Sequence, residues 1–235
     1  MAVEHLKKAW AAYKRNLCPL IGAYLLILFV VLVLAGAGIW LASMSSTAGL
    51  EPLLFGTIIL LTAAAIVGAI LSGAYIAVAR DALKKKARIV IMWNVARERW
   101  KSLLGGLIIQ ILITILLFVP ALVAGIYGYV NKSMAFIGLA TLLAIPAIFA
   151  SLLFNFIVYA IVIDKTKVMD GVCKSYRVVR KNYLDILVLY VIIVIISLVL
   201  TIIPILGMIL SVLFVTPFSV LAFTSWYLSK RTQRR

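Results

Sequence analysis

Residues 168–203 read VMDGVCKSYRVVRKNYLDILVLYVIIVIISLVLTII, a basic segment that runs directly into an apolar one. In the basic segment, apolar residues recur at near-helical spacing and the basic side chains take the other faces, which is typical of a helix at a membrane interface. These basic residues are Lys174, Arg177, Arg180 and Lys181. From Leu184 onward about 20 residues are almost all apolar, enough to cross a bilayer as a helix. The stretch therefore predicts an interfacial helix joined to a membrane span.

The composition of the whole chain points to the same class. Of 235 residues, 66% are hydrophobic and 13% are charged, whereas soluble domains carry about 25% charged residues. We therefore predict an all-α integral membrane protein. A net charge of +16 would suggest nucleic acid in a soluble chain, but here the basic residues lie in short segments between apolar runs, where they meet lipid headgroups. We expect membrane lipid, preferentially anionic, as the partner and no nucleic acid.

Apolar runs predict six membrane spans in one domain of residues 1–235. They are Leu17–Leu41, Leu53–Ala79, a third from Leu103, Met134–Ile163 with a kink at Pro146, Leu184–Ile203 and a sixth with Pro217 in its interior, which ends near Leu228. The third span has two alternative ends, Pro120 and Tyr129, and the second would make Asn131 to Ser133 the outer turn. We interpret residues 17–41 as a retained span, because about 25 apolar residues exceed the core of a signal peptide.

The basic residues predict the orientation of these spans. Of the 23 Lys and Arg residues, 22 lie before the first span, in residues 80–101, in residues 164–183 or at the C-terminal end, and only Lys132 lies on the opposite side. Cytoplasmic connections carry the excess of positive charge in membrane proteins. We therefore expect a multi-pass protein of the cell membrane with both termini in the cytoplasm.

Three short sequences predict an internal repeat, because each closes a basic segment just before a span. They are Lys14-Arg15-Asn16, Trp100-Lys101-Ser102 and Arg180-Lys181-Asn182. Two spans follow each of them, so the three units point the same way and form parallel repeats of an amphipathic interfacial helix and a membrane hairpin. The repeats cover residues 1–81, 82–164 and 165–235. Pseudo-threefold packing and a simple bundle are both compatible with this pattern.

Small residues in the second and third spans predict close helix contacts. Gly68, Ser72 and Gly73 lie among alanines, and Gly105 and Gly106 follow the basic segment of the second repeat. In lipid, small side chains at such positions let helix backbones approach one another. We expect the repeats to pack through these residues.

A family resemblance covers residues 164–230. The segment from Met169 to Tyr183, followed by a long apolar span, resembles the segment before a late span in the membrane domain of glycerophosphoryl diester phosphodiesterases and in related bacterial and archaeal six-span proteins. Elsewhere the likeness is architectural. The soluble barrel that carries catalysis in that enzyme family has no counterpart in these 235 residues, so the resemblance implies membrane placement without enzyme activity.

The residue types that carry chemistry are sparse. All seven acidic residues fall in connections or near span ends, and we expect the most central, Asp185, to complement a helix dipole. His5, the single histidine, is expected to titrate at the surface. Cys18 and Cys173 are expected to be reduced packing residues, with palmitoylation or redox sensing as the alternative. We expect no catalytic residue, no metal and no cofactor.

Two hypotheses for the function remain. The first, which we favour, is a lipid-associated structural or accessory protein whose basic interfacial helices bind anionic headgroups of the inner leaflet. The binding residues would be Lys84, Lys85, Lys86, Arg88, Trp93, Arg97, Arg99, Trp100, Lys101, Lys174, Arg177, Arg180 and Lys181. The second is a small transporter or channel with a polar path between the repeats, lined by Gln110, Thr114, Ser151, Asn155 and Ser197. The oligomeric state stays open.

Overall fold

The computed structural model describes residues 2–48, 51–84, 86–203 and 206–232. Within these ranges every regular element is a helix, and six helices are long and apolar enough to cross a membrane. The predicted all-helical class and the number of membrane-spanning segments are confirmed. The elements are α1 (Ala2–Arg15), α2 (Leu17–Ala48), α3 (Glu51–Lys84), α4 (Ile89–Val130), α5 (Met134–Ser151), α6 (Ile157–Ile163), α7 (Val168–Lys181), α8 (Tyr183–Thr201), α9 (Leu206–Leu210), the π-helix η1 (Ser211–Val215) and α10 (Thr216–Thr232).

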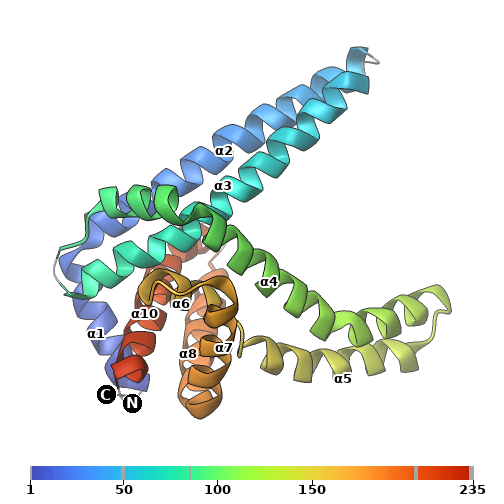
Figure 1. Cartoon of the computed structure of the whole chain (residues 1–235). Coiled ribbons are helices and arrows are strands. Elements are labelled where there is room, and N and C mark those ends of the chain that lie inside the picture. Colours follow the sequence, from blue (N-terminus) through green and yellow to red (C-terminus); the bar gives the residue numbers. More distant parts are fainter. Residues whose placement is uncertain (1, 49–50, 85, 204–205, 233–235) are drawn as a thin grey trace.

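The helices form a hub with two projecting arms (Figure 1). The first arm is the hairpin of α2 and α3, the second is the hairpin of α4 and α5, and the two diverge from the hub. The hub contains α1, α6, α7, α8 and α10 together with the adjoining ends of α3 and α4, and the two chain termini lie side by side in it. Its core is apolar and includes fully buried aromatic residues, Tyr13, Tyr75, Phe156, Trp226 and Tyr227.

Asparagine marks the end of an interfacial helix in two of the three predicted repeats. Asn16 lies between α1 and α2, and its amide donates to the Ala12 carbonyl at 3.1 Å. Asn182 lies between α7 and α8, and its amide donates to the Val178 carbonyl at the same distance. Asn16 also bonds Ala82 and the backbone N–H of Ala87, so it ties α1 to the end of α3. In both places the asparagine side chain bonds the carbonyl four residues earlier, a local bond that is typical of Asn near helix ends.

The second repeat departs from this pattern, because Ser102 lies inside α4. The predicted basic connection of residues 80–101 is therefore wrong as a separate element: Arg80 to Lys84 end α3, and everything from Ile89 belongs to one helix. That helix runs through Pro120 to Val130, which settles the end of the third span. At 42 residues it is about 63 Å long, twice the bilayer core, and it changes direction along its length (Figure 1).

The fourth span is shorter than predicted, since the helix breaks over residues 152–156 between α5 and α6. Pro146 lies inside α5, so proline does not cause the break. Two side chains from the following helices bind carbonyl groups beside it: Ser175 of α7 donates to Leu153 at 2.7 Å, and Tyr183 of α8 donates to Phe149 at 2.9 Å. In a regular helix these two carbonyl groups would accept hydrogen bonds from backbone N–H groups. At the break the side chains of Ser175 and Tyr183 supply the hydrogen bonds instead, as irregular backbone within a membrane protein requires.

A second irregularity precedes α10, where the last span contains the π-helix η1. Pro217 is the second residue of α10 and has no N–H, so the Leu213 carbonyl lacks its helical partner. The Tyr13 hydroxyl donates a long hydrogen bond of 3.5 Å to this oxygen. Pro204 and Ile205, between α8 and α9, lie outside the described residues.

Most of the predicted small residues do permit close approach. A Cβ at Gly106 would overlap the Ile161 side chain of α6, and one at Gly105 would lie 3.1 Å from Val168 of α7. At Gly73 a Cβ would lie 3.1 Å from Leu103, whereas Gly68 faces α2 of its own hairpin. Ser72 is exposed, so the prediction that it packs between helices is wrong. Its neighbours on either side face the core, and it occupies the opposite side of α3.

Candidate functional site

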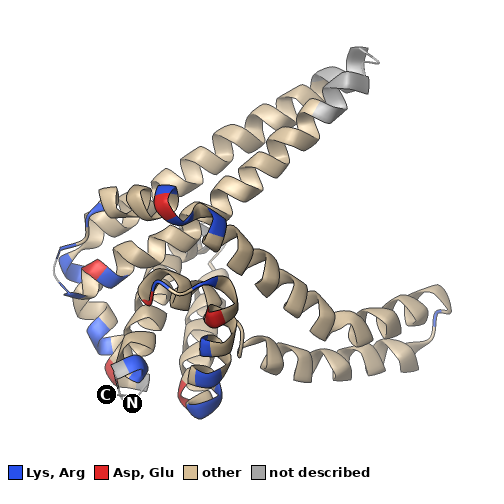
Figure 2. Ribbon diagram, viewed as in Figure 1, with Lys and Arg blue, Asp and Glu red and all other residues tan. Residues whose placement is uncertain are grey.

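Most basic residues lie on the hub, and Lys132 lies at the tip of the second arm (Figure 2). Of the residues predicted to bind anionic lipid, eight basic ones are exposed: Lys84, Lys86, Arg88, Arg97, Lys101, Arg177, Arg180 and Lys181. Lys85 lies outside the described residues. We call this exposed set the basic surface. Its charges come from the end of α3, the connection that follows it, the start of α4 and the end of α7.

Two of the predicted lipid ligands have partners inside the hub instead. Arg99 donates to the Ile161 carbonyl at 3.3 Å, and Lys174 forms an ion pair of 2.6 Å with Asp164. Both are only partly exposed. These side chains hold α4 and α7 against the end of α6, which reduces their availability to a headgroup.

The two tryptophans of α4 frame an apolar groove. Met92, Ala96 and Leu103 are buried in the hub, while Trp93 and Trp100 are 62% and 46% exposed. A groove of about 300 Å³ lies between these rings and α3 and is lined by Val67, Ile70, Leu71, Trp93, Ala96, Arg97 and Trp100. Arg97 is its one charged lining residue among those described. The groove thus joins apolar walls from a membrane span to the basic surface.

The predicted polar path is only partly assembled. Gln110 of α4 donates to the Asn155 side chain at 3.0 Å, and Asn155 donates to the Tyr190 hydroxyl at 3.0 Å. Tyr190, on α8, was not predicted. Thr114, Ser151 and Ser197 instead donate to carbonyl groups of their own helices. The structure therefore brings together one amide pair and a tyrosine around the helix break.

A buried charge cluster joins three parts of the hub and was missed from the sequence. The Asp164 side chain is 3% exposed, forms ion pairs with Lys174 of α7 and with Arg231 of α10 at 2.8 Å, and accepts a hydrogen bond from the Tyr227 hydroxyl at 2.6 Å. Asp185 also has a specific partner, because its carboxylate lies 2.6 Å from the Lys230 amine. Both acids stand at span ends as predicted, but Arg231 and Lys230, which pair with them, come from the distant helix α10.

Three sequence predictions about single residues need correction or refinement. His5 is 6% exposed, so it is a buried residue of α1 and not a surface one. Cys18 and Cys173 are both exposed, so neither is a packing residue. Across the described residues, no group of three or more His, Cys, Asp or Glu side chains could hold a metal ion.

Comparison with known proteins gives one match. Residues 26–230 match a family model described as a domain of unknown function, DUF7847. The chain belongs to this family. No curated protein and no solved structure matches the chain. The resemblance of residues 164–230 to the phosphodiesterase membrane domain stays a prediction.

The DUF7847 match begins inside α2 and ends in α10. It therefore contains both arms, the apolar groove, the helix break at residues 152–156 and the Asp164 cluster. The amphipathic helix α1 precedes the matched region.

Proposed function

We propose that this membrane protein associates with anionic lipid through the basic surface and the apolar groove beside it, with the basic surface on the cytoplasmic side. The observation that carries the proposal is the groove between α3 and α4, where Trp93 and Trp100 stand exposed beside Arg97. Tryptophan favours the membrane interface, and arginine suits the phosphate of a headgroup. An acyl chain against Val67 and Ile70 would place its headgroup near these cations.

The electrostatic contribution supports the same assignment. Exposed basic residues near an anionic leaflet each contribute about 1 kcal/mol, so engagement of only part of the basic surface gives a measurable preference. The three-repeat arrangement, with an interfacial helix leading each hairpin, would present α1, the start of α4 and α7 to one leaflet. The shared asparagine breaks after α1 and α7 support that arrangement.

The proposal is tested by replacing Lys84, Lys85, Lys86 and Arg88 with Gln and measuring the lipid that remains bound after purification. We expect the ratio of anionic to zwitterionic lipid to fall severalfold at low salt, and the difference to shrink near 0.1 M salt, where charges are screened within about 10 Å. The matched control removes four other exposed lysines of the hub, Lys7, Lys14, Lys165 and Lys167. If the parent, the variant and the control retain the same ratio of anionic to zwitterionic lipid, residues 84–88 serve only to set the topology.

The groove is tested separately by Trp93→Ala combined with Trp100→Ala. We expect loss of tightly bound lipid, because the exposed rings form two of the groove's walls. Trp40→Ala is the control, since Trp40 is 60% exposed on the first arm and does not line the groove. If the Trp40 variant loses as much lipid, the groove has no special role.

Transport is a second candidate function, favoured by the helix break at residues 152–156. Discontinuous spans with polar side chains at the break form binding sites in many transporters. Asn155, in the break, bonds Gln110 and Tyr190. Reaction of Asn155→Cys with a small water-soluble thiol reagent in a bilayer would reveal a water-filled path, whereas an unreactive Asn155→Cys would leave the network a packing feature. The Asn155→Cys variant needs a background with Cys18→Ser and Cys173→Ser, because those thiols are exposed.

A further inference from the structure

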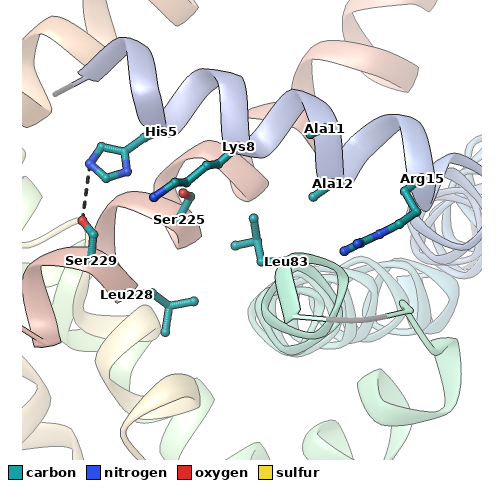
Figure 3. Close-up of a pocket in the computed structure, with 9 residues that line it drawn as sticks. All are labelled: His5, Lys8, Ala11, Ala12, Arg15, Leu83, Ser225, Leu228 and Ser229. Atoms are coloured by element: carbon teal, nitrogen blue, oxygen red, sulfur yellow. Dashed lines mark hydrogen bonds between the residues drawn. The ribbon is translucent and has the colours of Figure 1, made fainter.

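A second cavity lies in the hub, between α1, the end of α3 and α10 (Figure 3). It measures about 460 Å³. Its described lining residues include no Asp or Glu and are His5, Lys8, Ala11, Ala12, Arg15, Leu83, Ser225, Leu228 and Ser229. The cavity thus combines cationic and hydroxyl groups with an apolar floor. None of the residues of the basic surface or the groove lines it.

The two cations of the cavity differ in how they are held. Both project from the side of α1 that faces α10 and the end of α3 (Figure 3). The Arg15 guanidinium is anchored, because one of its N–H groups donates to the Ala82 carbonyl at 3.1 Å. Lys8 is exposed and forms no ion pair with the described residues. One fixed and one adjustable cation therefore face the same space.

His5 closes one end of the cavity and carries an unpaired nitrogen. The Ser229 hydroxyl donates to the Trp226 carbonyl at 2.8 Å, so the His5 Nε2–H is the donor in the 3.3 Å contact between His5 and Ser229. The buried Nδ1 has no hydrogen-bond partner among the described residues. In the neutral ring Nδ1 is an acceptor, and protonation turns it into a donor. A buried polar atom without a partner is costly, which favours a ligand here.

The charges around His5 leave it in a positive environment. Burial lowers its pKa below the usual 6.5, and Lys8 and Lys230 lower the pKa further. Asp185 and Glu4 act in the opposite direction, but Asp185 is already paired with Lys230. An anion in the cavity would relieve this repulsion.

We propose that the cavity binds a phosphoryl group, supplied by free phosphate or by the headgroup of a lipid such as phosphatidic acid. Lys8 and Arg15 provide charge-assisted hydrogen bonds, and protonated His5 donates from Nδ1. The hydroxyl of Ser225, which is buried on α10, stands at the same cavity. Leu83 and Leu228 provide the apolar surface that a glycerol or the start of an acyl chain would meet.

The single histidine makes the site measurable. The protein, carrying a tag without histidine, is placed in phosphatidylcholine nanodiscs, and the pKa of His5 is followed by the NMR signal of its ring. One arm adds inorganic phosphate, a second adds sodium chloride at equal ionic strength, and a third includes phosphatidic acid in the bilayer. We expect the pKa of His5 to rise with phosphate or with phosphatidic acid and not with sodium chloride.

Two variants of α1 with the same loss of charge decide whether the cavity is responsible. Lys8→Gln should weaken binding of the anion by about tenfold, because it removes a charged hydrogen bond. The affinity is read from the anion concentration at which the pKa of His5 rises. Lys7→Gln should not, since Lys7 is exposed and does not line the cavity. The surface potential of an anionic bilayer acts alike on both variants, so it cannot produce a difference between them.

Each outcome has one meaning. A response to free phosphate assigns the site to a soluble anion, and a response to phosphatidic acid alone assigns it to a headgroup. No rise with either, a rise matched by sodium chloride, or identical behaviour of Lys8→Gln and Lys7→Gln would overturn the proposal. The lipid preference of residues 84–88 is measured on other residues, so the two proposals fail independently.

Discussion

The hub and the arms use similar apolar residues and bury them to different extents. Trp226 and Tyr75 in the hub are 0% and 2% exposed, while Leu116 of α4 and Ile126 near the arm tip are 72% and 64% exposed. Each arm helix packs mainly on its hairpin partner, and the arms diverge (Figure 1). The hub therefore has a protein core, whereas the arms, like the outer face of α8, leave apolar surface of a size that soluble proteins do not expose.

The polar residues show the same division. Asn16, Ser175 and Asp164 each link elements far apart in sequence, and all three lie in the hub. In the arms, Thr141 donates only to a carbonyl of its own helix. The hub thus has specific polar links that fix one arrangement, while the arms rely on hairpin packing and on lipid.

The largest effect is expected from breaking the charge cluster. Asp164→Asn leaves Lys174 and Arg231 without their carboxylate in a site that is 3% exposed, and removal of one partner of a buried ion pair costs about 3 kcal/mol or more. We expect a large loss of the free energy of unfolding, measured by denaturation in detergent. Leu116→Ala on the second arm is the control and should change this free energy by less than about 0.5 kcal/mol. Equal losses would remove the distinction between hub and arm.

A smaller effect is expected from enlarging a glycine at the base of the arms. Gly73→Leu forces a side chain against Leu103 of α4 and Val158 of α6, and overpacking of this kind costs about 1 to 3 kcal/mol. Gly138→Leu on α5 is the matched control, because a Cβ there meets nothing within 4 Å. Thermal unfolding in detergent compares the two variants. An unchanged midpoint for Gly73→Leu would show that this surface faces lipid.

The smallest effect concerns pH and His5. Because the pKa of His5 is lowered in the folded protein, the unfolded chain binds a proton more readily, and stability is complete above the unfolded value of 6.5. As pH falls below 6.5, the free energy of unfolding should decrease until the folded-state pKa is passed. His5→Gln should lose this part of the pH dependence, as measured by denaturation between pH 7.5 and about 5. A parent protein whose stability does not fall in this window would contradict the buried position of His5.

The sequence predicted the class and the spans because both depend on long apolar runs such as Leu17–Leu41. The sequence also predicted the close contacts of Gly105 and Gly106, because small residues at a span's start favour close helix packing. The break at residues 152–156 could not be predicted, because no proline or glycine marks it and its partners Ser175 and Tyr183 lie on the later helices α7 and α8.

The predictions of individual site residues were less accurate for a related reason. The sequence shows which side chains in residues 89–103 are apolar. It does not show that the hub buries Met92 and leaves Trp93 exposed. Charge patterning likewise could not show that Lys174 pairs with Asp164. The cavity at His5 is formed by both ends of the chain, and no local pattern indicates that α1 and α10 meet.

The central claim, a basic surface that faces the cytoplasm and arms that cross the bilayer, is tested most directly by thiol labelling in sealed membranes. The exposed Cys173 on α7 reports on the hub in a Cys18→Ser background. Ser133→Cys, at the start of α5, reports on the tip of the second arm when both native cysteines are replaced. A membrane-impermeant maleimide should label Ser133→Cys from outside intact cells and should label Cys173 only in inverted vesicles. Labelling of Cys173 from outside, or of both positions from the same face, would contradict the account.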